Sequence, residues 1–258
     1  MTLNGIIKYQ IKMLIRKLGY DISPFYDQQN LKDFTKNHFE LINSVKNYTL
    51  TSPERMFALI ESVRYVIKNQ IPGDVVECGV WRGGSMMLVA KTLTELDHTN
   101  RNLYLFDTFE GTTKPTEIDR DYLGNSMLEI WKKEFEGKEK LPSSADYASL
   151  DEVQKNLFST KYPKDKIHFI KGKVEETILG NIPEKISILR LDTDWYESTK
   201  YELENLFPKL SSGGILIIDD YGHFEGSRKA VDEYFEKNKI KYFFNRIDYT
   251  GRLIIKFQ

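Results

Sequence analysis

The sequence predicts an α/β protein with a doubly wound, seven-stranded sheet, mostly parallel and closed by an antiparallel C-terminal hairpin. Two observations predict this class. Short apolar runs that end at an acidic residue or a glycine alternate with amphipathic helical segments, which is typical of parallel strands joined by helices. The last two apolar runs instead flank the turn Tyr249-Thr250-Gly251, which indicates a hairpin.

Residues 1–50 precede this alternation, and we expect them to form a helical arm that serves as a lid or as an oligomer contact. A helical stripe mixes apolar and basic side chains: Ile7, Ile11, Leu14, Ile15 and Leu18 with Lys8, Lys12, Arg16 and Lys17. Because the basic residues interrupt the apolar run, it does not fit a signal peptide. The stripe favours a helix that docks on its own domain or a sister subunit, with a membrane-surface helix as the alternative.

The main domain, residues 51–258, is expected to begin with a helix at Thr51-Ser52-Pro53-Glu54, which supplies a cap, a first-turn proline and an acid. The expected strands are Asp74–Cys78, Asn102–Phe106, Ile167–Ile170, Ile186–Leu191, Ile215–Ile218, Lys241–Arg246 and Arg252–Phe257. The expected helices between them are Met86–Leu96, Val153–Phe158, Ser198–Leu206 and Ser227–Asn238.

One connection is much longer than a crossover requires. About 60 residues separate Asp107 from Ile167. Long loops in compact domains are usually functional or disordered. We therefore expect the insertion at residues 111–161 to cover a site, and its Tyr122, Trp131 and Tyr147 offer aromatic faces to a ligand. A subunit interface is the alternative role.

Composition narrows the function classes. The chain has 37 Lys plus Arg and 38 Asp plus Glu, so it has no basic excess with which to neutralise nucleic-acid phosphates. A single cysteine, Cys78, excludes an intramolecular disulfide and suits a reducing compartment. No apolar stretch approaches the length of a membrane span. We expect a cytoplasmic protein without stable membrane insertion.

The segment Val76–Ser85, VECGVWRGGS, is a glycine-rich turn between the first strand and a helix. Such a turn lets backbone N–H groups and the helix N-terminus approach a ligand closely. Because the spacing departs from G-x-G-x-x-G, it favours a nucleoside ligand without phosphates over a diphosphate. Glu77, at the end of the strand, is suited to hold an ammonium group. A tight strand–helix turn without a ligand is the alternative.

Asp107 stands at the end of the second strand, about 30 residues after Glu77. An acid at this position accepts hydrogen bonds from the two ribose hydroxyls of a bound nucleoside. The alternative is a helix cap or a turn residue. Its combination with the glycine turn favours the nucleoside site.

Three aspartates end the fourth and fifth strands: Asp192 in ILRLDTD, and Asp219 and Asp220 in ILIIDDYG. Adjacent parallel strands bring these ends together at the sheet edge where α/β proteins bind ligands. With no Lys or Arg expected beside them, the carboxylates would repel one another unless a cation lay between them. Hard oxygen ligands suit Mg²⁺, and without a Cys or His cluster zinc is excluded. Caps and turn acids without metal are the alternative.

Several motifs together resemble a known family, the macrocin- and mycinamicin-type sugar O-methyltransferases. They are VECGVWRGGS, LYLFDTFEGTT, RLDTDWYEST, LIIDDYGHFEGSRKAVDEY and the segment Tyr48–Val66. The resemblance implies a class I methyltransferase (Rossmann-like) fold, S-adenosylmethionine and Mg²⁺ as cofactors, and a sugar or glycosylated small molecule as acceptor. A homo-oligomer is expected.

The resemblance also implies roles for individual residues. Donor contacts are implied at Thr51, Glu77, Gly79, Arg82, Gly83, Ser85, Asp107 and Asp192. Metal ligands are implied at Asp192, Asp219 and Asp220, with Asp192 also as the base. Because a metal-bound carboxylate is a weak base, His223, three residues after Asp220, is the second candidate, and Glu197 also remains open as the base.

Other functions remain open at this point. A Mg²⁺-dependent hydrolase could use the aspartates, but it would not need Glu77, the glycine turn and Asp107. A donor-binding protein without catalysis would need that set and not the aspartates. Within the enzymes, a catechol-type small-molecule O-methyltransferase is the nearest alternative. The residues do not identify the acceptor.

Overall fold

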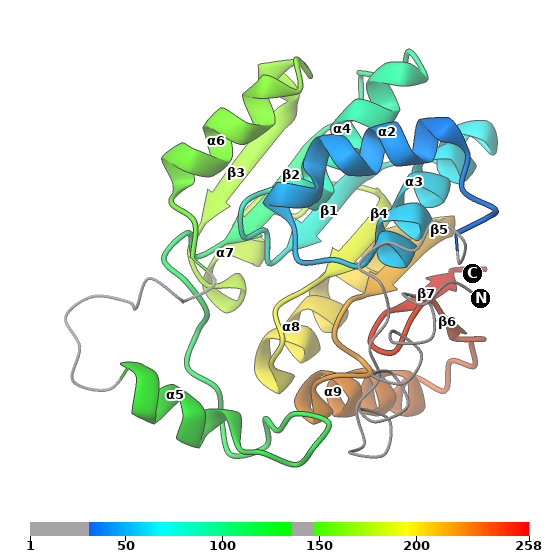
Figure 1. Cartoon of the computed structure of the whole chain (residues 1–258). Coiled ribbons are helices and arrows are strands. Elements are labelled where there is room, and N and C mark those ends of the chain that lie inside the picture. The colour runs from blue at the N-terminus through cyan, green and yellow to red at the C-terminus, as the bar shows by residue number, and fades with distance from the viewer. Residues whose placement is uncertain (1–30, 136–146, 258) are drawn as a thin grey trace, which may run out of the picture. The chain divides into compact units, whose positions relative to one another are not determined.

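The computed structural model describes residues 31–135 and 147–257 (Figure 1). The chain divides into two compact units, Met1–Asn37 and His38–Gln258, so the division falls before the expected boundary at residue 50. The basic and apolar stripe expected between Ile7 and Leu18 lies outside the described residues. All that follows concerns the second unit.

The sheet confirms the predicted fold class. It has seven strands in the order β3-β2-β1-β4-β5-β7-β6. The strands are β1 (Asp74–Cys78), β2 (Leu103–Asp107), β3 (Ile167–Lys171), β4 (Ile186–Leu191), β5 (Leu210–Ile218), β6 (Asn245–Arg246) and β7 (Arg252–Ile255). The first five pair in parallel, and β7 pairs antiparallel with both β5 and β6. The strand order proceeds from β1 toward one edge of the sheet and from β4 toward the other, so it reverses between these two strands. Sheets of this kind bind ligands at that point.

Helices cover both faces of this sheet (Figure 1). One layer packs α3 (Pro53–Lys68) on α4 (Gly84–Glu95) and α4 on α6 (Leu150–Ser159). The other packs α8 (Tyr196–Leu206) against α7 (Val174–Asn181) and α9 (Glu225–Lys237). The remaining described helices are α2 (Lys36–Val45), α5 (Met127–Phe135) and the 3-10 turns Lys46–Tyr48, Lys164–Lys166 and Phe207–Lys209. Among the described residues, no helix combines the length and apolar character needed to cross a membrane.

Most helices and strands begin or end one to three residues from the expected bounds, and two strands, β5 and β6, differ by more. β5 begins at Leu210 instead of Ile215, because Gly213 takes a left-handed φ of 80° inside the strand and its pairing with β4 shifts register there. The β6 strand is confined to Asn245–Arg246, so the first half of the expected Lys241–Arg246 strand is irregular. The short helix α7 was not expected, since Val174 and Ile178 are its only buried residues.

The central strand β4 is buried along its whole length, as expected for a strand covered on both faces. Isoleucines and leucines fill it, and Cys78 at the end of β1 is a buried free thiol in the same core. One charged residue, Arg190, interrupts the apolar run and is only 4% exposed. A guanidinium at this depth requires carboxylate partners.

The insertion between β2 and β3 contains one ordinary element. Because α6 packs on α4 and β3, it is the normal crossover helix, and the additional chain precedes it. The described part of that chain is fixed to the domain through Asp119, which is fully buried. Asp119 Oδ1 accepts from the Tyr196 N–H at the start of α8 (2.8 Å), and Oδ2 accepts from the N–H and hydroxyl of Thr116 (2.7 and 2.8 Å).

We predict that Asp119→Ala lowers the free energy of unfolding by about 2–4 kcal/mol, because it leaves the buried N–H of Tyr196 and the Thr116 donors without an acceptor. Urea denaturation measures the change. The neighbouring exposed Glu117→Ala is the matched control and should stay within about 0.5 kcal/mol of the parent. Equal stability of the two variants would show that Asp119 does not hold the insertion.

Candidate active site

A cavity of about 390 Å³ lies at the carboxyl ends of the strands, where the strand order reverses between β1 and β4. Its walls come from the segment Tyr48–Thr51, the turn after β1, the ends of β2, β4 and β5, and the turn between β6 and β7. The volume is within the range of small-molecule and cofactor sites. Of the donor contacts that the sequence predicts, it is lined by Thr51, Gly79, Ser85, Asp107 and Asp192.

The turn after β1 brings backbone to the cavity wall. Gly79 has a φ of 80°, and a Cβ at this position would collide with the carbonyl oxygen of Asp192. Only glycine therefore allows the turn to lie against the end of β4. Gly83 begins α4 with a φ of 87°, and a Cβ there would lie 2.6 Å from Leu157 Cδ2. The two glycines have different tasks, since Gly79 lines the cavity and Gly83 packs on α6.

Asp107 holds this turn in place. Its Oδ2 accepts from the backbone N–H groups of Val80 (2.6 Å) and Trp81 (3.1 Å), and Oδ1 accepts from the Phe109 N–H (2.7 Å). The sequence predicts a ribose contact at Asp107. The structure shows that its carboxylate holds the turn after β1, a role that sequence spacing does not reveal. Asp107 also lines the cavity, and its ribose contact stays a prediction.

Two other predicted donor contacts do not line the cavity. The Arg82 side chain ion-pairs with Glu152 on α6 (2.7 Å), donates to the Asn47 carbonyl (2.9 Å) and stacks on the Tyr48 ring. Arg82 thus supports the cavity wall at Tyr48 without lining the cavity itself. Glu77 is 1% exposed and lies beneath the cavity floor.

Arg190 is the centre of a buried ion network. Its Nη1 donates to Glu77 Oε1 (2.6 Å) and Asp192 Oδ2 (2.7 Å), and its Nη2 donates to Asp219 Oδ1 (2.7 Å). Burial acts to lower the pKa of Arg190, but the charges of Asp192, Asp219 and Glu77 raise it well above its ordinary value. One guanidinium therefore connects the ends of β1, β4 and β5.

Glu77 is only half satisfied within this network. Its Oε1 accepts from Arg190, while Oε2 is buried and has no hydrogen-bond partner. Burial raises the pKa of Glu77 to about 8, against the opposing charge of Arg190. The open oxygen is an acceptor without a donor in the structure, and the ammonium contact at Glu77 stays a prediction.

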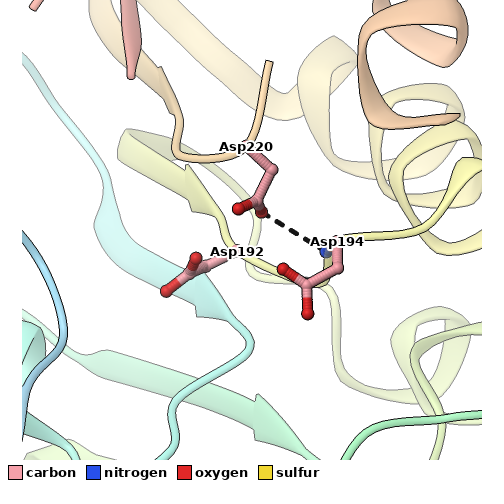
Figure 2. A group of neighbouring side chains, drawn as sticks. All are labelled: Asp192, Asp194 and Asp220. Atoms are coloured by element: carbon pink, nitrogen blue, oxygen red, sulfur yellow. Dashed lines mark hydrogen bonds between the residues drawn. The ribbon is translucent and has the colours of Figure 1, made fainter. Parts of the chain in front are cut away.

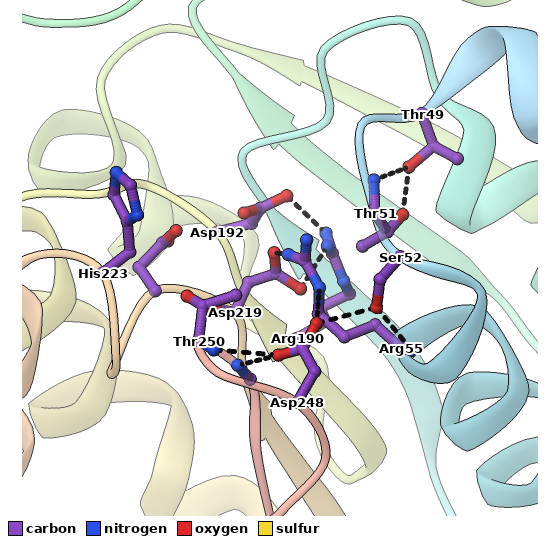
Figure 3. A network of polar contacts seen from close by, with 12 residues as sticks. Thr49, Thr51, Ser52, Arg55, Arg190, Asp192, Asp219, His223, Asp248 and Thr250 are labelled. Atoms are coloured by element: carbon purple, nitrogen blue, oxygen red, sulfur yellow. Dashed lines mark hydrogen bonds and ion pairs between the residues drawn. The ribbon is translucent and has the colours of Figure 1, made fainter. Parts of the chain in front are cut away.

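A second arginine extends the network to the hairpin (Figure 3). Arg55, on α3, ion-pairs with Asp219 Oδ2 and, through Nε, with Asp248 Oδ2 (3.0 Å). Asp248 also accepts from the Ser52 hydroxyl (2.7 Å) and, through Oδ1, from the N–H groups of Thr250 (2.9 Å) and Gly251 (2.7 Å). Asp219 is thus held between two arginines.

These arginines correct the predicted metal trio. The expectation that Asp192, Asp219 and Asp220 lack a cationic partner is wrong, because Arg190 contacts the first two and Arg55 contacts Asp219. The structure instead groups Asp192, Asp194 and Asp220 (Figure 2), and one carboxylate oxygen from each lies within 4.8 Å of those of the other two. Both oxygens of Asp219 are directed to arginines, and Asp194 takes its place.

The backbone at Asp194 supports this grouping. Asp194 has a left-handed φ of 68°, which is uncommon outside glycine and is concentrated at functional sites. Its N–H donates to Asp220 Oδ2 (3.3 Å). Burial raises the pKa of Asp192 to about 7, and burial together with the charges of Asp194, Asp192 and Asp219 raises the pKa of Asp220 well above its ordinary value. Such a carboxylate group favours a bound cation.

His223 also lines the cavity. Its Nδ1 lies 3.0 Å from the Tyr249 hydroxyl, and its backbone N–H donates to the Asp220 carbonyl (2.9 Å). Burial lowers the pKa of His223, against the opposing charge of Asp121. A largely neutral imidazole at this position can accept a proton.

Sequence reasoning missed four residues of the site: Arg55, Asp194, Arg190 and Tyr249. Two of them carried a signal. Arg190 is the one charge in an otherwise apolar strand, which requires buried partners. Asp194 follows Asp192 by two residues in the same loop, a spacing that allows both carboxylates to face one ligand. Arg55 and Tyr249 reach the site only through tertiary packing, which no local pattern reports.

Comparison with known proteins agrees with this geometry. The model of the family described as macrocin-O-methyltransferase (TylF) matches residues 27–256. A tetracenomycin-C rhamnosyl 4'-O-methyltransferase of Streptomyces olivaceus is 34% identical over 204 residues, covering 79% of this chain and 74% of the relative. The mycinamicin III 3''-O-methyltransferase of Micromonospora griseorubida is 31% identical over 204 residues, covering 79% of this chain and 76% of the relative.

The same likeness appears among solved structures. The O-methyltransferase NovP superposes with a TM-score of 0.72 at 31% sequence identity, covering 82% of this chain and 83% of NovP. The calicheamicin methyltransferase CalS11, at 16% identity and a TM-score of 0.58, shares the fold.

We predict that Arg190→Met lowers the free energy of unfolding by about 3–5 kcal/mol, because it leaves three buried carboxylates without their shared cation. Urea denaturation measures the loss. Arg228→Met is the matched control, since Arg228 makes a surface ion pair with Glu225 (3.8 Å) and should contribute less than about 1 kcal/mol. If both variants lost equally little, Arg190 would not be the centre of the network.

Proposed function

The chain belongs to the macrocin O-methyltransferase family and is an S-adenosylmethionine-dependent O-methyltransferase, and we propose that it methylates a hydroxyl on the sugar of a glycosylated small molecule with the help of Mg²⁺. The observation that carries this proposal is one cavity that combines the glycine turn and Asp107 with three converging aspartates. A hydrolase would not need the first set, and a donor-binding protein would not need the second.

The donor fits the residues on the β1 side of the cavity. Gly79 lets the backbone approach closely, and Asp107, Thr51 and Ser85 face the same space. Below them the unpartnered Oε2 of Glu77 is an orphaned buried acceptor, as an ammonium contact requires. We assign these residues to S-adenosylmethionine, with Arg82 and Gly83 supporting the turn from outside the cavity.

Mg²⁺ fits the residues on the β4–β5 side. Asp192, Asp194 and Asp220 offer hard carboxylate oxygens within 4.8 Å of one another. Asp219 is assigned a positioning role, because its two oxygens hold Arg190 and Arg55. When bound, the donor supplies an electrophilic methyl group, and the metal lowers the pKa of a nearby acceptor hydroxyl and fixes its angle.

The chain's own residues then orient the reactants and accept the proton. Arg190 fixes the Asp192 carboxylate by a charge-assisted hydrogen bond of 2.7 Å. Because Asp192 is engaged by Arg190 and assigned to the metal, we assign the base to His223. With Nδ1–H donating to the Tyr249 hydroxyl, Nε2 of His223 is the atom that accepts the proton.

The acceptor class rests on the relatives. The Streptomyces olivaceus relative is described as acting on a rhamnosyl group, so an alkyl rhamnoside is the first acceptor to test. A catechol also presents two neighbouring hydroxyls, so 3,4-dihydroxybenzoate is the discriminating second acceptor. Transfer of a labelled methyl group to the catechol and never to a glycoside would overturn the sugar assignment.

Residues 111–161 are proposed to contribute to the acceptor side. An isolated bridge joins Asp121 of this insertion to Phe224, which lines the cavity. The proposed covering role of the arm at residues 1–50, and a homo-oligomer built through it, remain predictions because most of the arm lies outside the described residues.

We predict that Asp107→Ala weakens the binding of S-adenosylhomocysteine, measured by calorimetry, roughly ten- to hundredfold. The variant loses a charge-assisted contact and loosens the turn that Asp107 holds. Asp165→Ala is the control, because Asp165 is an exposed acid distant in sequence from Asp107. This variant should bind S-adenosylhomocysteine as tightly as the parent does. Unchanged affinity in a folded Asp107→Ala protein would remove Asp107 from the donor site.

We also predict that chelation with EDTA abolishes methyl transfer and that Mg²⁺ restores it. Asp194→Asn and Asp220→Asn should raise the Mg²⁺ concentration for half-maximal activity roughly ten- to hundredfold, since each removes a charged ligand. Asp97→Asn is a matched control, because Asp97 is exposed and shares the left-handed backbone of Asp194, with a φ of 57°. Full activity in EDTA would show that the aspartates are structural.

A further inference from the structure

Three aromatic rings lie close together: Tyr122 from the insertion, His223 from the loop after β5, and Tyr249 from the turn between β6 and β7. His223 and Tyr249 line the cavity, and Tyr122 packs on both of them without lining it. The Tyr122 and His223 centroids are 5.2 Å apart, and those of Tyr122 and Tyr249 are 6.2 Å apart. His223 and Tyr249 are 5.9 Å apart. We refer to these three residues as the aromatic wall.

The wall has exposed faces although its position is fixed. Tyr122 is 57% exposed and Tyr249 is 55% exposed. Gly222 and Tyr249 lie so close that a Cβ on Gly222 would collide with the Tyr249 carbonyl oxygen, and Gly222 N–H donates to the Thr250 carbonyl (2.9 Å). The turn that carries Tyr249 is thus locked against the loop that carries His223. The wall is a rigid surface that leaves ring area to solvent.

The wall is continuous with the proposed metal site. The N–H groups of His223 and Phe224 both donate to the carbonyl oxygen of Asp220 (2.9 Å each). His223 and Tyr249 line the same cavity as Asp192, Asp194 and Asp220. A molecule lying on these rings therefore has its edge beside the three carboxylates.

The chemistry of the wall suits a pyranose ring. One face of a pyranose carries C–H groups that pack on an aromatic ring, while its edge carries hydroxyls that need polar partners. The wall offers ring faces, and the neighbouring aspartates offer oxygens to the edge. A purely apolar ligand would bring no hydrogen-bond donor to those carboxylates.

We propose that Tyr122, His223 and Tyr249 form the acceptor subsite, on which the pyranose ring stacks with two neighbouring hydroxyls directed to Asp192, Asp194 and Asp220. This inference deepens the proposed function and rests on it. It gives the C-terminal hairpin a direct part in substrate choice.

Tyr249 has two separable tasks in this arrangement. Its ring supplies stacking area, and its hydroxyl, 3.0 Å from His223 Nδ1, orients the imidazole. Tyr249→Leu removes both, whereas Tyr249→Phe removes only the hydroxyl. Acceptor binding should follow the ring, and the rate of transfer should follow the hydroxyl.

The test measures binding of methyl α-L-rhamnopyranoside to the full chain saturated with S-adenosylhomocysteine and Mg²⁺, by saturation-transfer NMR titration. We expect Tyr249→Leu and Tyr122→Leu each to weaken rhamnoside binding roughly five- to tenfold, and Tyr249→Phe to keep it within about twofold. Phe243→Leu is the matched control, since Phe243 is 83% exposed and does not line the cavity. Calorimetry with S-adenosylhomocysteine verifies that every variant retains its donor site.

Outcomes for the wall and for the proposed function are distinct. Rhamnoside binding that is absent in the parent, or equal in all variants, overturns the wall. If rhamnoside binding depends on Tyr122 and Tyr249 but no methyl group is transferred from S-adenosylmethionine, the acceptor subsite is supported and the proposed function is overturned. Transfer with kcat lowered in Tyr249→Phe and KM for the rhamnoside raised in Tyr249→Leu supports both.

Discussion

The buried guanidinium of Arg190 is the interaction on which the rest of the site depends. It contacts a carboxylate from β1, one from the loop after β4 and one from β5, so it fixes the relative positions of three strand ends. Without it, Glu77, Asp192 and Asp219 would be unpaired negative charges in a medium of low dielectric constant. A buried ion network of this kind contributes more to geometry than to net stability.

The two halves of the cavity share this support. Our proposal assigns Glu77 to the donor side and Asp192 to the acceptor side, and one nitrogen of Arg190 contacts both carboxylates. Gly79 strengthens the coupling because the backbone of the donor turn lies directly against Asp192. Alignment of a methyl group with an oxygen tolerates little misplacement, so a common rigid support for both partners is an advantage.

The sequence predicted the architecture because its signals are local. Apolar runs ending at Asp107, Asp192 and Asp219 marked the strands, and parallel pairing placed their ends together. Local patterns could not show the direction of a side chain at the end of a strand. Asp219 and Asp220 are neighbours in sequence in the bend after β5, yet the first is directed to arginines and the second to the carboxylate group.

The remaining differences come from tertiary contacts. Arg55 on α3 approaches Asp219 across 164 residues, and Ser52 reaches Asp248 across 196. No spacing rule reports such contacts. The ribose role predicted for Asp107 likewise gave no sign that the same carboxylate holds the glycine turn through backbone N–H groups.

The turn between β6 and β7 has a consequence for how new substrate ranges could arise. Asp248 belongs to the ion network, and the next residue, Tyr249, belongs to the aromatic wall. A hairpin grafted from a relative would therefore alter acceptor preference and the electrostatic balance beneath the donor in one step. The segment around Tyr122 is anchored through Asp119 and not through the ion network, so recombination that keeps Asp119 should be tolerated more readily in the insertion than in the hairpin.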